Sequence, residues 1–275
     1  MSAILQLDLA FNRHAYAGTR LTRRIVHYPY VVTNTFCIDT VPADMVSVIL
    51  QSASGSILAG DRLALRIAAG PGAAAHVSTP AATTVHRMPC GTMATERVNL
   101  TIGPGALLEF MPEPRILFPD AALVQELRLV VDAKGTVVVA DGFLTHDPQE
   151  GNARFRRLCS TIEIARPDRT VLAVDRFDID GRWQLLGASR FVCHGVVIVV
   201  GPFARDGLST LAAAVTSAVA ALGGSYAATS ILPSECGISL RLACSSGATL
   251  QAATNAAWIA IRCRLTGSPP GRRRI

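Results

Sequence analysis

The chain has 275 residues and a mass of 29.0 kDa, which is enough for one large domain or two small ones. Half of its residues are hydrophobic and only 17% are charged, which excludes an intrinsically disordered chain and predicts a large buried core. The net charge is +6, but the positive side chains are scattered arginines with a single lysine, Lys134, and few aromatic residues lie among them. We therefore expect no nucleic-acid partner.

The sequence also predicts where the protein works. No basic segment followed by an apolar run opens the chain, and no apolar stretch is long enough to span a membrane, so we expect a cytoplasmic protein with no membrane partner. The seven cysteines are widely spaced, odd in number and never arranged as CxxC. This pattern favours free thiols in a reducing compartment over a disulfide framework or a structural zinc site.

Residues that alternate between apolar and polar predict β-strands along the first two thirds of the chain. The first such run covers residues 4–11, and a second extended piece leads from Gly18 to Val32. Further strands are expected at Met45–Leu50, Leu63–Ile67, Arg97–Ile102 and Leu123–Val131.

A loose repeat is superimposed on these strands. Gly72, Gly105 and Gly135 lie 33 and 30 residues apart, and each opens an apolar strand. These strands are Ala73–Ser78, Ala106–Met111 and Thr136–Ala140. Repeats of this length are typical of stacked coils, so the pattern favours a β-solenoid, with an ordinary β-sandwich as the alternative.

The pattern changes in the last third of the chain. Strands are predicted at Phe155–Ala165, Thr170–Phe177, Phe191–Val200, Tyr226–Ile231 and Gly237–Ala243, and helices at Leu208–Leu222 and Gly247–Leu265. The predicted fold is mainly β: a β-helical, solenoid-like body of stacked short strands at 1–203 and a small two-helix α+β element at 204–275. Since no low-complexity linker separates the two parts, we expect a single domain over residues 1–275.

Five carboxylates are candidates for function. Asp61 lies in a glycine-containing turn before a strand, Glu109 lies in the middle of an apolar strand, and Glu113 follows it. Asp141 and Asp175 lie at or near strand ends. Such a row resembles a series of oxygen ligands more than an acid/base pair. The alternatives are a turn cap at Asp61 and arginine-paired or solvated surface charges elsewhere.

Two weaker patterns involve histidine. His86 and Cys90, with a methionine between them, form a soft-ligand set that suits late transition metals, although a loop with a core methionine has the same pattern. His146 beside Asp147 could act as a general base, but no nucleophile motif, P-loop, GxGxxG or HExxH accompanies the pair. We therefore expect that the protein is not an enzyme.

A series of short motifs carries a family resemblance. Gly55–Leu63 reads GSILAGDRL, Ala73–Arg87 reads AAAHVSTPAATTVHR, and Gly105–Phe118 reads GALLEFMPEPRILF. Before them stands GTRL at Gly18–Leu21, and after them stand VDRF at Val174–Phe177 and AAW at Ala256–Trp258. Together and in this order, they resemble the UreD/UreH family of urease accessory proteins over nearly the whole chain.

The chain also departs from the family pattern. Ser56 and Ala59 stand for family glycines, His86 for a tyrosine, Glu96 for a glutamine and Phe110 for a tryptophan. The usual motif is nearly absent near Thr145–Phe155. These departures mark a divergent member and leave open whether the client is urease or another metalloenzyme.

The resemblance implies a non-enzymatic scaffold with a β-helical body. Such a protein couples UreF-like and UreG-like partners to the urease apoprotein, as a possible dimer within the accessory complex. It holds no permanent cofactor and conducts nickel, its transient cargo, through an internal tunnel. Family positions place Asp61, Asp141 and Asp175 on that path, and the chemistry of oxygen ligands adds Glu109 and Glu113. Two alternatives remain: a pure adaptor with no metal path, and a hydrolase centred on His146 and Asp147.

Overall fold

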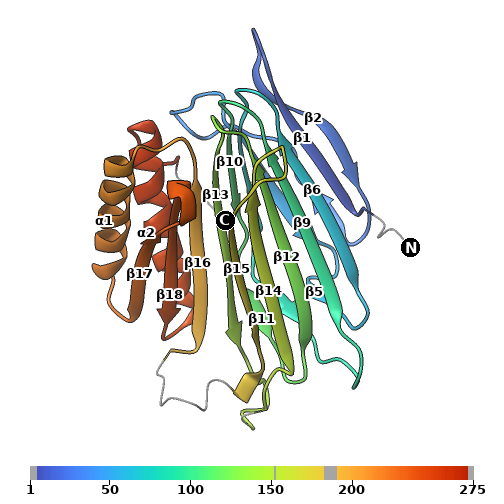
Figure 1. The fold of residues 1–275 in the computed structure, drawn as a ribbon. Helices are drawn as coiled ribbons and strands as arrows, with labels where there is room; N and C mark the ends of the chain where they lie inside the picture. Colours follow the sequence, from blue (N-terminus) through green and yellow to red (C-terminus); the bar gives the residue numbers. More distant parts are fainter. Residues whose placement is uncertain (1–4, 152, 183–190, 272–275) are drawn as a thin grey trace.

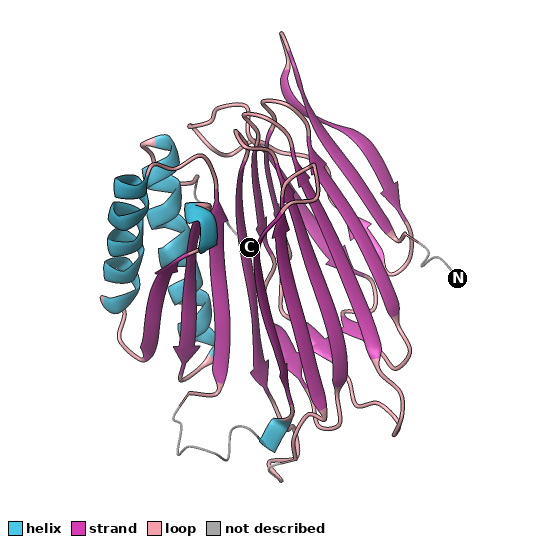
Figure 2. Ribbon diagram, in the orientation of Figure 1, coloured by secondary structure: helices cyan, strands magenta, loops and turns pink. Residues whose placement is uncertain are grey.

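Two β-sheets face each other, and two helices cover the outer side of one of them (Figures 1 and 2). The structure, a computed structural model, describes residues 5–151, 153–182 and 191–271. In these ranges no helix is long and apolar enough to cross a membrane.

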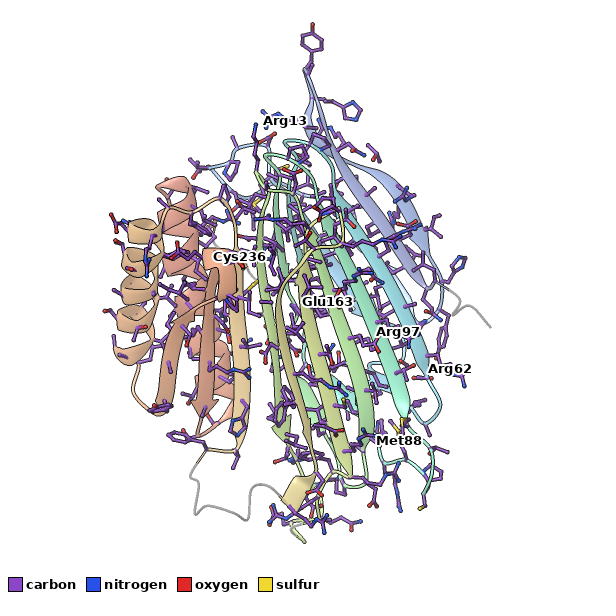
Figure 3. All side chains as sticks on the ribbon, viewed as in Figure 1. Arg13, Arg62, Met88, Arg97, Glu163 and Cys236 are labelled. Carbon is purple, nitrogen blue, oxygen red and sulfur yellow. The ribbon has the colours of Figure 1, made fainter. Side chains whose placement is uncertain are left out.

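The first sheet has seven strands in the order β15-β14-β12-β9-β6-β1-β2. Their bounds are β1 Leu7–His14, β2 Gly18–Val26, β6 Arg62–Ala69, β9 Ala94–Ile102, β12 Ala122–Val131, β14 Arg157–Ala165 and β15 Val171–Ile179. Ion pairs cross its outward face, where Arg97 meets Glu126 at 2.8 Å and Arg128 meets Glu163 at 3.0 Å (Figure 3).

The second sheet has eleven strands, with a main path β17-β18-β16-β13-β10-β7-β4-β3. The bounds on this path are β3 Tyr30–Val32, β4 Val46–Ser52, β7 Ala74–Ser78, β10 Leu107–Met111, β13 Thr136–Thr145, β16 Cys193–Val200, β17 Ser225–Ile231 and β18 Gly237–Cys244. Three short strands form a side branch: β5 Ser56–Ile57, β8 Thr83–Val85 and β11 Arg115–Leu117.

The predicted solenoid is confirmed by how these strands connect. The chain passes from the first sheet to the second and on to the side branch, as β6-β7-β8 and then β9-β10-β11, and continues through β12 and β13. Successive coils pair in parallel in both sheets: β6 with β9 and β9 with β12 in the first sheet, and β7 with β10 and β10 with β13 in the second. The strands before and after these coils are antiparallel additions, such as β2 and β15.

The repeating glycines make the turns between the two sheets. Gly72 and Gly105 adopt φ values of +65° and +66°, a conformation that other residues rarely take. The N–H of Gly72 donates to the carbonyl of Pro104 at 3.0 Å, and the N–H of Gly105 donates to that of Lys134 at 3.0 Å, so the turns stack. At Gly135 a Cβ would lie 2.8 Å from the carbonyl oxygen of Gly103, because consecutive turns are in close contact.

The two helices pack on the outward face of the second sheet. Helix α1 (Arg205–Ala220) begins three residues before the predicted start, and α2 (Gly247–Thr266) begins where it was predicted, with Ser246 as its N-cap and Gly267 as its C-cap. A short 3-10 helix, η2 (Pro233–Glu235), precedes β18. One apolar core fills the space between the sheets, and a second joins the helices to β13, β16 and β18. The mainly β class with two C-terminal helices is thus confirmed.

Candidate functional site

A row of polar side chains crosses the inner face of the first sheet. Glu96 on β9, Gln125 on β12 and Ser160 on β14 are direct register partners, and each is at most 8% exposed. Their neighbours along each strand, at the same inward positions, are apolar residues such as Val98 and Leu123. We call these three side chains the polar rung.

Two charged residues of the second sheet face the polar rung. Arg115, the first residue of β11, donates from one terminal nitrogen to Oδ1 of Asp141 at 2.8 Å and from the other to Glu96. Gln125 donates to Asp141 Oδ2 at 2.5 Å and to the hydroxyl of Ser160 at 2.9 Å. The five residues therefore form one hydrogen-bonded network that bridges the two sheets.

The environment shifts the ionisation of this network. Burial raises the pKa of Asp141 above its usual value, and the Arg115 guanidinium only partly offsets this. Burial opposes the charge on Arg115, but the adjacent carboxylates of Glu96 and Asp141 outweigh it, and the pKa of Arg115 rises. The pKa of Tyr30 is raised well above its usual value by burial and by the nearby charge of Glu96.

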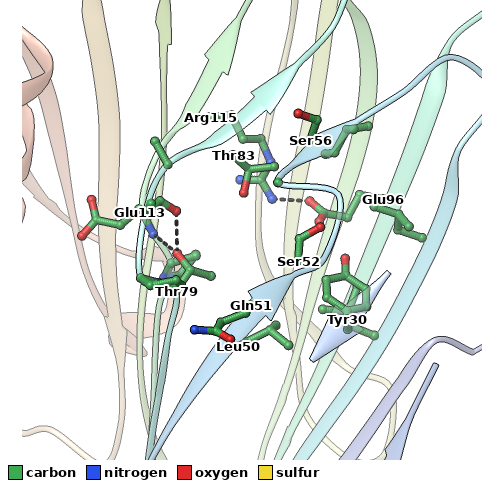
Figure 4. A pocket seen from close by; sticks show the side chains of 18 of the residues that line it. Tyr30, Leu50, Gln51, Ser52, Ser56, Thr79, Thr83, Glu96, Glu113 and Arg115 are labelled. Carbon is green, nitrogen blue, oxygen red and sulfur yellow. Dashed lines mark hydrogen bonds and ion pairs between the residues drawn. The ribbon is translucent and has the colours of Figure 1, made fainter. Parts of the chain in front are cut away.

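Three cavities follow one another along this network. A cavity of about 310 Å³, the Tyr30 cavity, has Tyr30, Glu96, Glu113 and Arg115 in its wall (Figure 4). It shares Glu96 and Arg115 with a small pocket of about 20 Å³, which also reaches Gln125 and Asp141. On the far side, Asp141 lines a third cavity of about 200 Å³, the Phe143 cavity, with Phe143 and Arg241 in its wall.

Asp61 sits next to this row of cavities but serves a turn. Its Oδ2 accepts the backbone N–H of Leu58 at 2.8 Å, and it is half-buried just before β6. This is the turn-cap role that aspartate often has. Its backbone carbonyl accepts the N–H of Thr95 at 2.8 Å, next to Glu96 in the wall of the Tyr30 cavity.

Asp175 and Glu113 lie at the borders of the cavities. Asp175, on β15 of the first sheet, forms an ion pair with Arg241 on β18 of the second sheet, and Arg241 lines the Phe143 cavity. The carboxylate of Glu113 accepts a hydrogen bond from Gln251 of α2 at 3.0 Å, while its backbone N–H donates to Thr79 at 2.8 Å (Figure 4).

Glu109 is separated from this row, on the opposite face of the second sheet. Its carboxylate is 0% exposed and accepts hydrogen bonds from Arg262 of α2 at 2.7 and 2.5 Å. His76 Nδ1 lies 2.8 Å from it on the neighbouring strand. Arg262, also fully buried, reaches Asp39 at 2.9 Å, and we call these four residues the α2 clasp.

The α2 clasp fixes the charge of Glu109. Burial alone would raise the pKa of Glu109, but hydrogen bonds from His76 and Arg262 outweigh it and lower the pKa to about 2. The clasp also borders a cavity of about 630 Å³ that His76, Trp258 and Glu113 help to line. Glu109 thus anchors helix α2 to the sheet in this structure.

The histidine patterns lie elsewhere. His86 Nε2 is 3.2 Å from the Ser56 hydroxyl, and the rings of His86 and His146 each pack edge-on against Phe118. Cys90 is an exposed free thiol. Asp147 accepts the backbone N–H groups of Gln149 and Ala153, so its carboxylate orders its own loop. Within the described ranges, no three His, Cys, Asp or Glu side chains gather as a metal-binding group.

The polar rung and Arg115 are not among the residues predicted from the sequence, although a signal is present for Glu96 and Gln125. In ATERVNLTI and LVQELRLVV, Glu96 and Gln125 occupy positions whose period-two neighbours are apolar and inward-facing. A polar residue at such a position must be buried and needs a partner. Strand parity alone could therefore have identified both residues as a buried polar pair.

The arrangement offers oxygen ligands and charge but no nucleophilic centre. Two carboxylates, an amide and a hydroxyl meet in a largely water-excluded space, and such oxygen groups give weak, exchangeable ligands for a divalent cation. In this structure the cation between the carboxylates is the guanidinium of Arg115.

Comparison with known proteins identifies the family of this chain. Residues 3–275 match the family model described as UreD urease accessory protein. Urease accessory protein UreD 2 of Bradyrhizobium sp. strain BTAi1 is 39% identical over 238 residues, 86% of this chain and 82% of that protein. UreD 2 of Bradyrhizobium sp. strain ORS 278 is 36% identical over 258 residues, covering 94% and 89% of the two chains. UreD 1 of Methylorubrum extorquens is 35% identical over 273 residues, covering 98% and 91%. The chain belongs to the UreD family of urease accessory proteins.

Proposed function

We propose that this protein is a non-enzymatic metallochaperone scaffold for urease. It couples UreF-like and UreG-like partners to the urease apoprotein and conducts nickel through the interior of its β-helix during active-site maturation. The observation that carries the proposal is the row of cavities between the two sheets, with the charged side chains of Glu96, Arg115 and Asp141 in their walls.

The chemistry of the walls supports transfer rather than storage. Carboxylate and amide oxygens bind a late first-row cation less tightly than thiolates and imidazoles do, so the cation can move on. Asp141 lines both the small pocket beside Gln125 and the Phe143 cavity, which makes it the residue common to the two halves of the path. Glu113 lines the Tyr30 cavity, Asp175 pairs with Arg241 in the wall of the Phe143 cavity, and Asp61 is hydrogen-bonded through its backbone to Thr95, beside Glu96.

Glu109 supports the scaffold rather than the path. Its two oxygens are already bonded to Arg262 and His76, and it faces α2 instead of the cavities. We propose that its role is to fix the helix on the sheet. The helices then present a rigid outer layer to the partners.

One experiment tests this function at the level of the whole protein. In a host deleted for this gene, urease activity and nickel content are measured per unit of purified urease. We expect urease that is made but lacks nickel, with both values restored by the intact gene. Unchanged activity and nickel content would refute a role in urease maturation and would direct attention to another metalloenzyme client.

A second experiment tests the path. Asp141→Asn removes one interior charge, and Asp178→Asn is the matched control, because Asp178 pairs with Arg157 on the exposed side of the first sheet. We expect Asp141→Asn to lower the nickel content of urease several-fold while the variant still co-purifies with its partners. Equal nickel content with both variants would exclude Asp141 from the path.

The buried ion pairs of Arg115 favour a second candidate function. Because the guanidinium already satisfies Glu96 and Asp141, the protein could act as an adaptor that recruits partners without conducting metal. An adaptor would tolerate neutral replacement of every interior carboxylate that leaves the fold intact, so the same pair of variants separates the two functions.

A further inference from the structure

Arg115 occupies the narrowest part of the proposed path. Its side chain is 11% exposed and lines both the Tyr30 cavity of about 310 Å³ and the adjoining pocket of about 20 Å³. Asp141 lines the same small pocket and also the Phe143 cavity, which Arg115 does not line. A cation moving from the Tyr30 cavity to the Phe143 cavity would therefore meet the guanidinium first.

The guanidinium takes the place that a divalent cation would need. It bonds Asp141 Oδ1 at 2.8 Å with one nitrogen and Glu96 with the other, so both carboxylates are engaged by a single positive charge. Arginine stays protonated at all physiological pH values, so this charge is permanent. A second cation in the same small pocket would be repelled strongly, because buried charges are poorly screened.

The bonding around Arg115 is incomplete. Its Nε and the Oε1 of Gln125 are both buried without a hydrogen-bond partner in the described part of the chain. Gln125 is 8% exposed and lines the small pocket, so its free oxygen is held at the same place as the two carboxylates. Buried polar atoms without partners are costly, which lowers the barrier to leaving this arrangement.

The structure also provides space for the side chain to move. Arg115 lines the Tyr30 cavity, whose volume of about 310 Å³ is large enough for an arginine side chain to reorient into it. Its wall contains Glu113, a second carboxylate that the guanidinium could approach. Withdrawal of Arg115 would leave Glu96, Asp141 and Gln125 Oε1 as an oxygen set for a divalent cation.

We propose that Arg115 is an exchangeable internal cation that closes the path, and that Ni²⁺ enters the Glu96–Asp141 site only when the guanidinium swings out into the Tyr30 cavity. This inference rests on the proposed function. It assigns the control of metal entry to one residue of this chain, and it explains why interior carboxylates that suit Ni²⁺ are paired with arginine in the resting protein.

The first test compares Ni²⁺ binding to purified full-length variants by equilibrium dialysis. Arg115→Gln removes the internal charge, and Arg97→Gln is the control, since Arg97 is exposed on the outward face of β9, the strand that carries Glu96, and pairs with Glu126. We expect Arg115→Gln to bind Ni²⁺ about tenfold more tightly than the wild type, and Arg97→Gln to match the wild type. A folded Arg115→Gln protein with wild-type affinity would overturn the inference.

A chemical-rescue experiment checks that the effect belongs to the site. Arg115→Ala leaves a space that fits free guanidinium, so millimolar methylguanidinium should weaken Ni²⁺ binding by this variant and leave the wild type unaffected. Equal effects on both proteins would count against the inference. If the neutral variants do not fold, Arg115→Lys decides, because an ammonium cannot hold both carboxylates in the bidentate manner of arginine. We expect Arg115→Lys to bind Ni²⁺ at least about threefold more tightly than the wild type, and an unchanged affinity for Ni²⁺ would overturn the inference.

Failure of this inference can be told apart from failure of the proposed function. If Arg115→Gln binds Ni²⁺ no better and still restores nickel to urease in the deleted host, Arg115 does not control metal entry, but the proposed path stands. If Arg115→Gln gains affinity for Ni²⁺ but the gene has no effect on the nickel content of urease, Arg115 controls metal binding at this site, and the proposed role in urease maturation fails.

Discussion

Replacement of Arg262 by methionine tests how the C-terminal helix is held. Arg262 is fully buried, donates to both oxygens of Glu109, and reaches Asp39 at 2.9 Å and the Met45 sulfur at 3.0 Å. Methionine keeps most of the side-chain length and apolar volume. The main loss is therefore the positive charge and its hydrogen bonds, rather than packing.

The expected cost follows from the charges left behind. Removing one partner of a buried ion pair destabilises a protein by about 3–5 kcal/mol, because the other charge stays buried without compensation. Arg262→Met takes the guanidinium from two fully buried carboxylates, but Glu109 keeps His76 at 2.8 Å and Asp39 keeps the N–H of Gly271 at 2.9 Å, so a loss within that range is expected. Typical domains unfold with about 5–15 kcal/mol, and the loss would therefore be a large fraction of the total.

Urea unfolding monitored by far-ultraviolet circular dichroism measures the effect. Arg264→Met is the matched control, because Arg264 lies on the same helix and is exposed. The control should change the free energy of unfolding by less than about 0.5 kcal/mol. Adding Glu109→Gln to Arg262→Met should restore part of the loss, with a coupling of about 0.5–3 kcal/mol.

A loss below about 1 kcal/mol for Arg262→Met would refute the clasp as an anchor of α2. A second result would refute it independently. If Glu109→Gln lowered the nickel content of urease while the amount and stability of the folded protein stayed at wild-type values, Glu109 would belong to the metal path instead.

Three further outcomes are expected from urea unfolding. Since the pKa of Glu109 is lowered from 4.5 to about 2, its ionisation stabilises the fold above pH 4.5, and this contribution should be lost as the pH falls towards 2, but not in Glu109→Gln. Gly135→Ala should lower the free energy of unfolding by about 1–3 kcal/mol, because its Cβ would lie 2.8 Å from a carbonyl oxygen of the preceding turn. The control Gly207→Ala is in an open helical position and should leave the stability unchanged or raise it. Asp175→Asn should lower the free energy of unfolding by less than about 1 kcal/mol, because its partner Arg241 is 54% exposed. A fall in urease nickel content in this variant would therefore reflect the proposed path and not the fold.

The coiled body could be predicted from the sequence because its signals are local. Each coil places an alternating strand directly after a turn glycine, and Gly72, Gly105 and Gly135 mark the same turn in successive coils. Alternation decides which side chains face inward, and the glycines decide where the chain crosses between the sheets. Both properties depend on neighbours within a few residues.

The charged network was harder to predict because its members come from separate coils. Arg115 meets Glu96 from 19 residues away and Asp141 from 26 residues away, and these contacts require the coils to be stacked in the correct register. The parity of Glu96 predicts that it is buried, but not which positive charge neutralises it. Arg115 follows a proline-rich segment, where alternation is interrupted and inward-facing positions cannot be assigned from the sequence.

Glu109 and Asp141 show what separates a residue of the proposed path from an anchor. They lie on neighbouring parallel strands, β10 and β13, but Glu109 pairs in register with Val138, which faces the helices, whereas Asp141 shares the inward parity of Val137 and Val139. Parity therefore puts the two carboxylates on opposite faces of one sheet. The sequence predicts that Glu109 lies on the face away from Leu108. Its partner Arg262, which covers that face, is 153 residues away along the chain, so their contact could not be predicted from local pattern. The carboxylate on the outward face can serve as an anchor because helix α2 covers that face. The carboxylate on the inward face can take part in the proposed path only if the guanidinium of Arg115, which it pairs with, can leave.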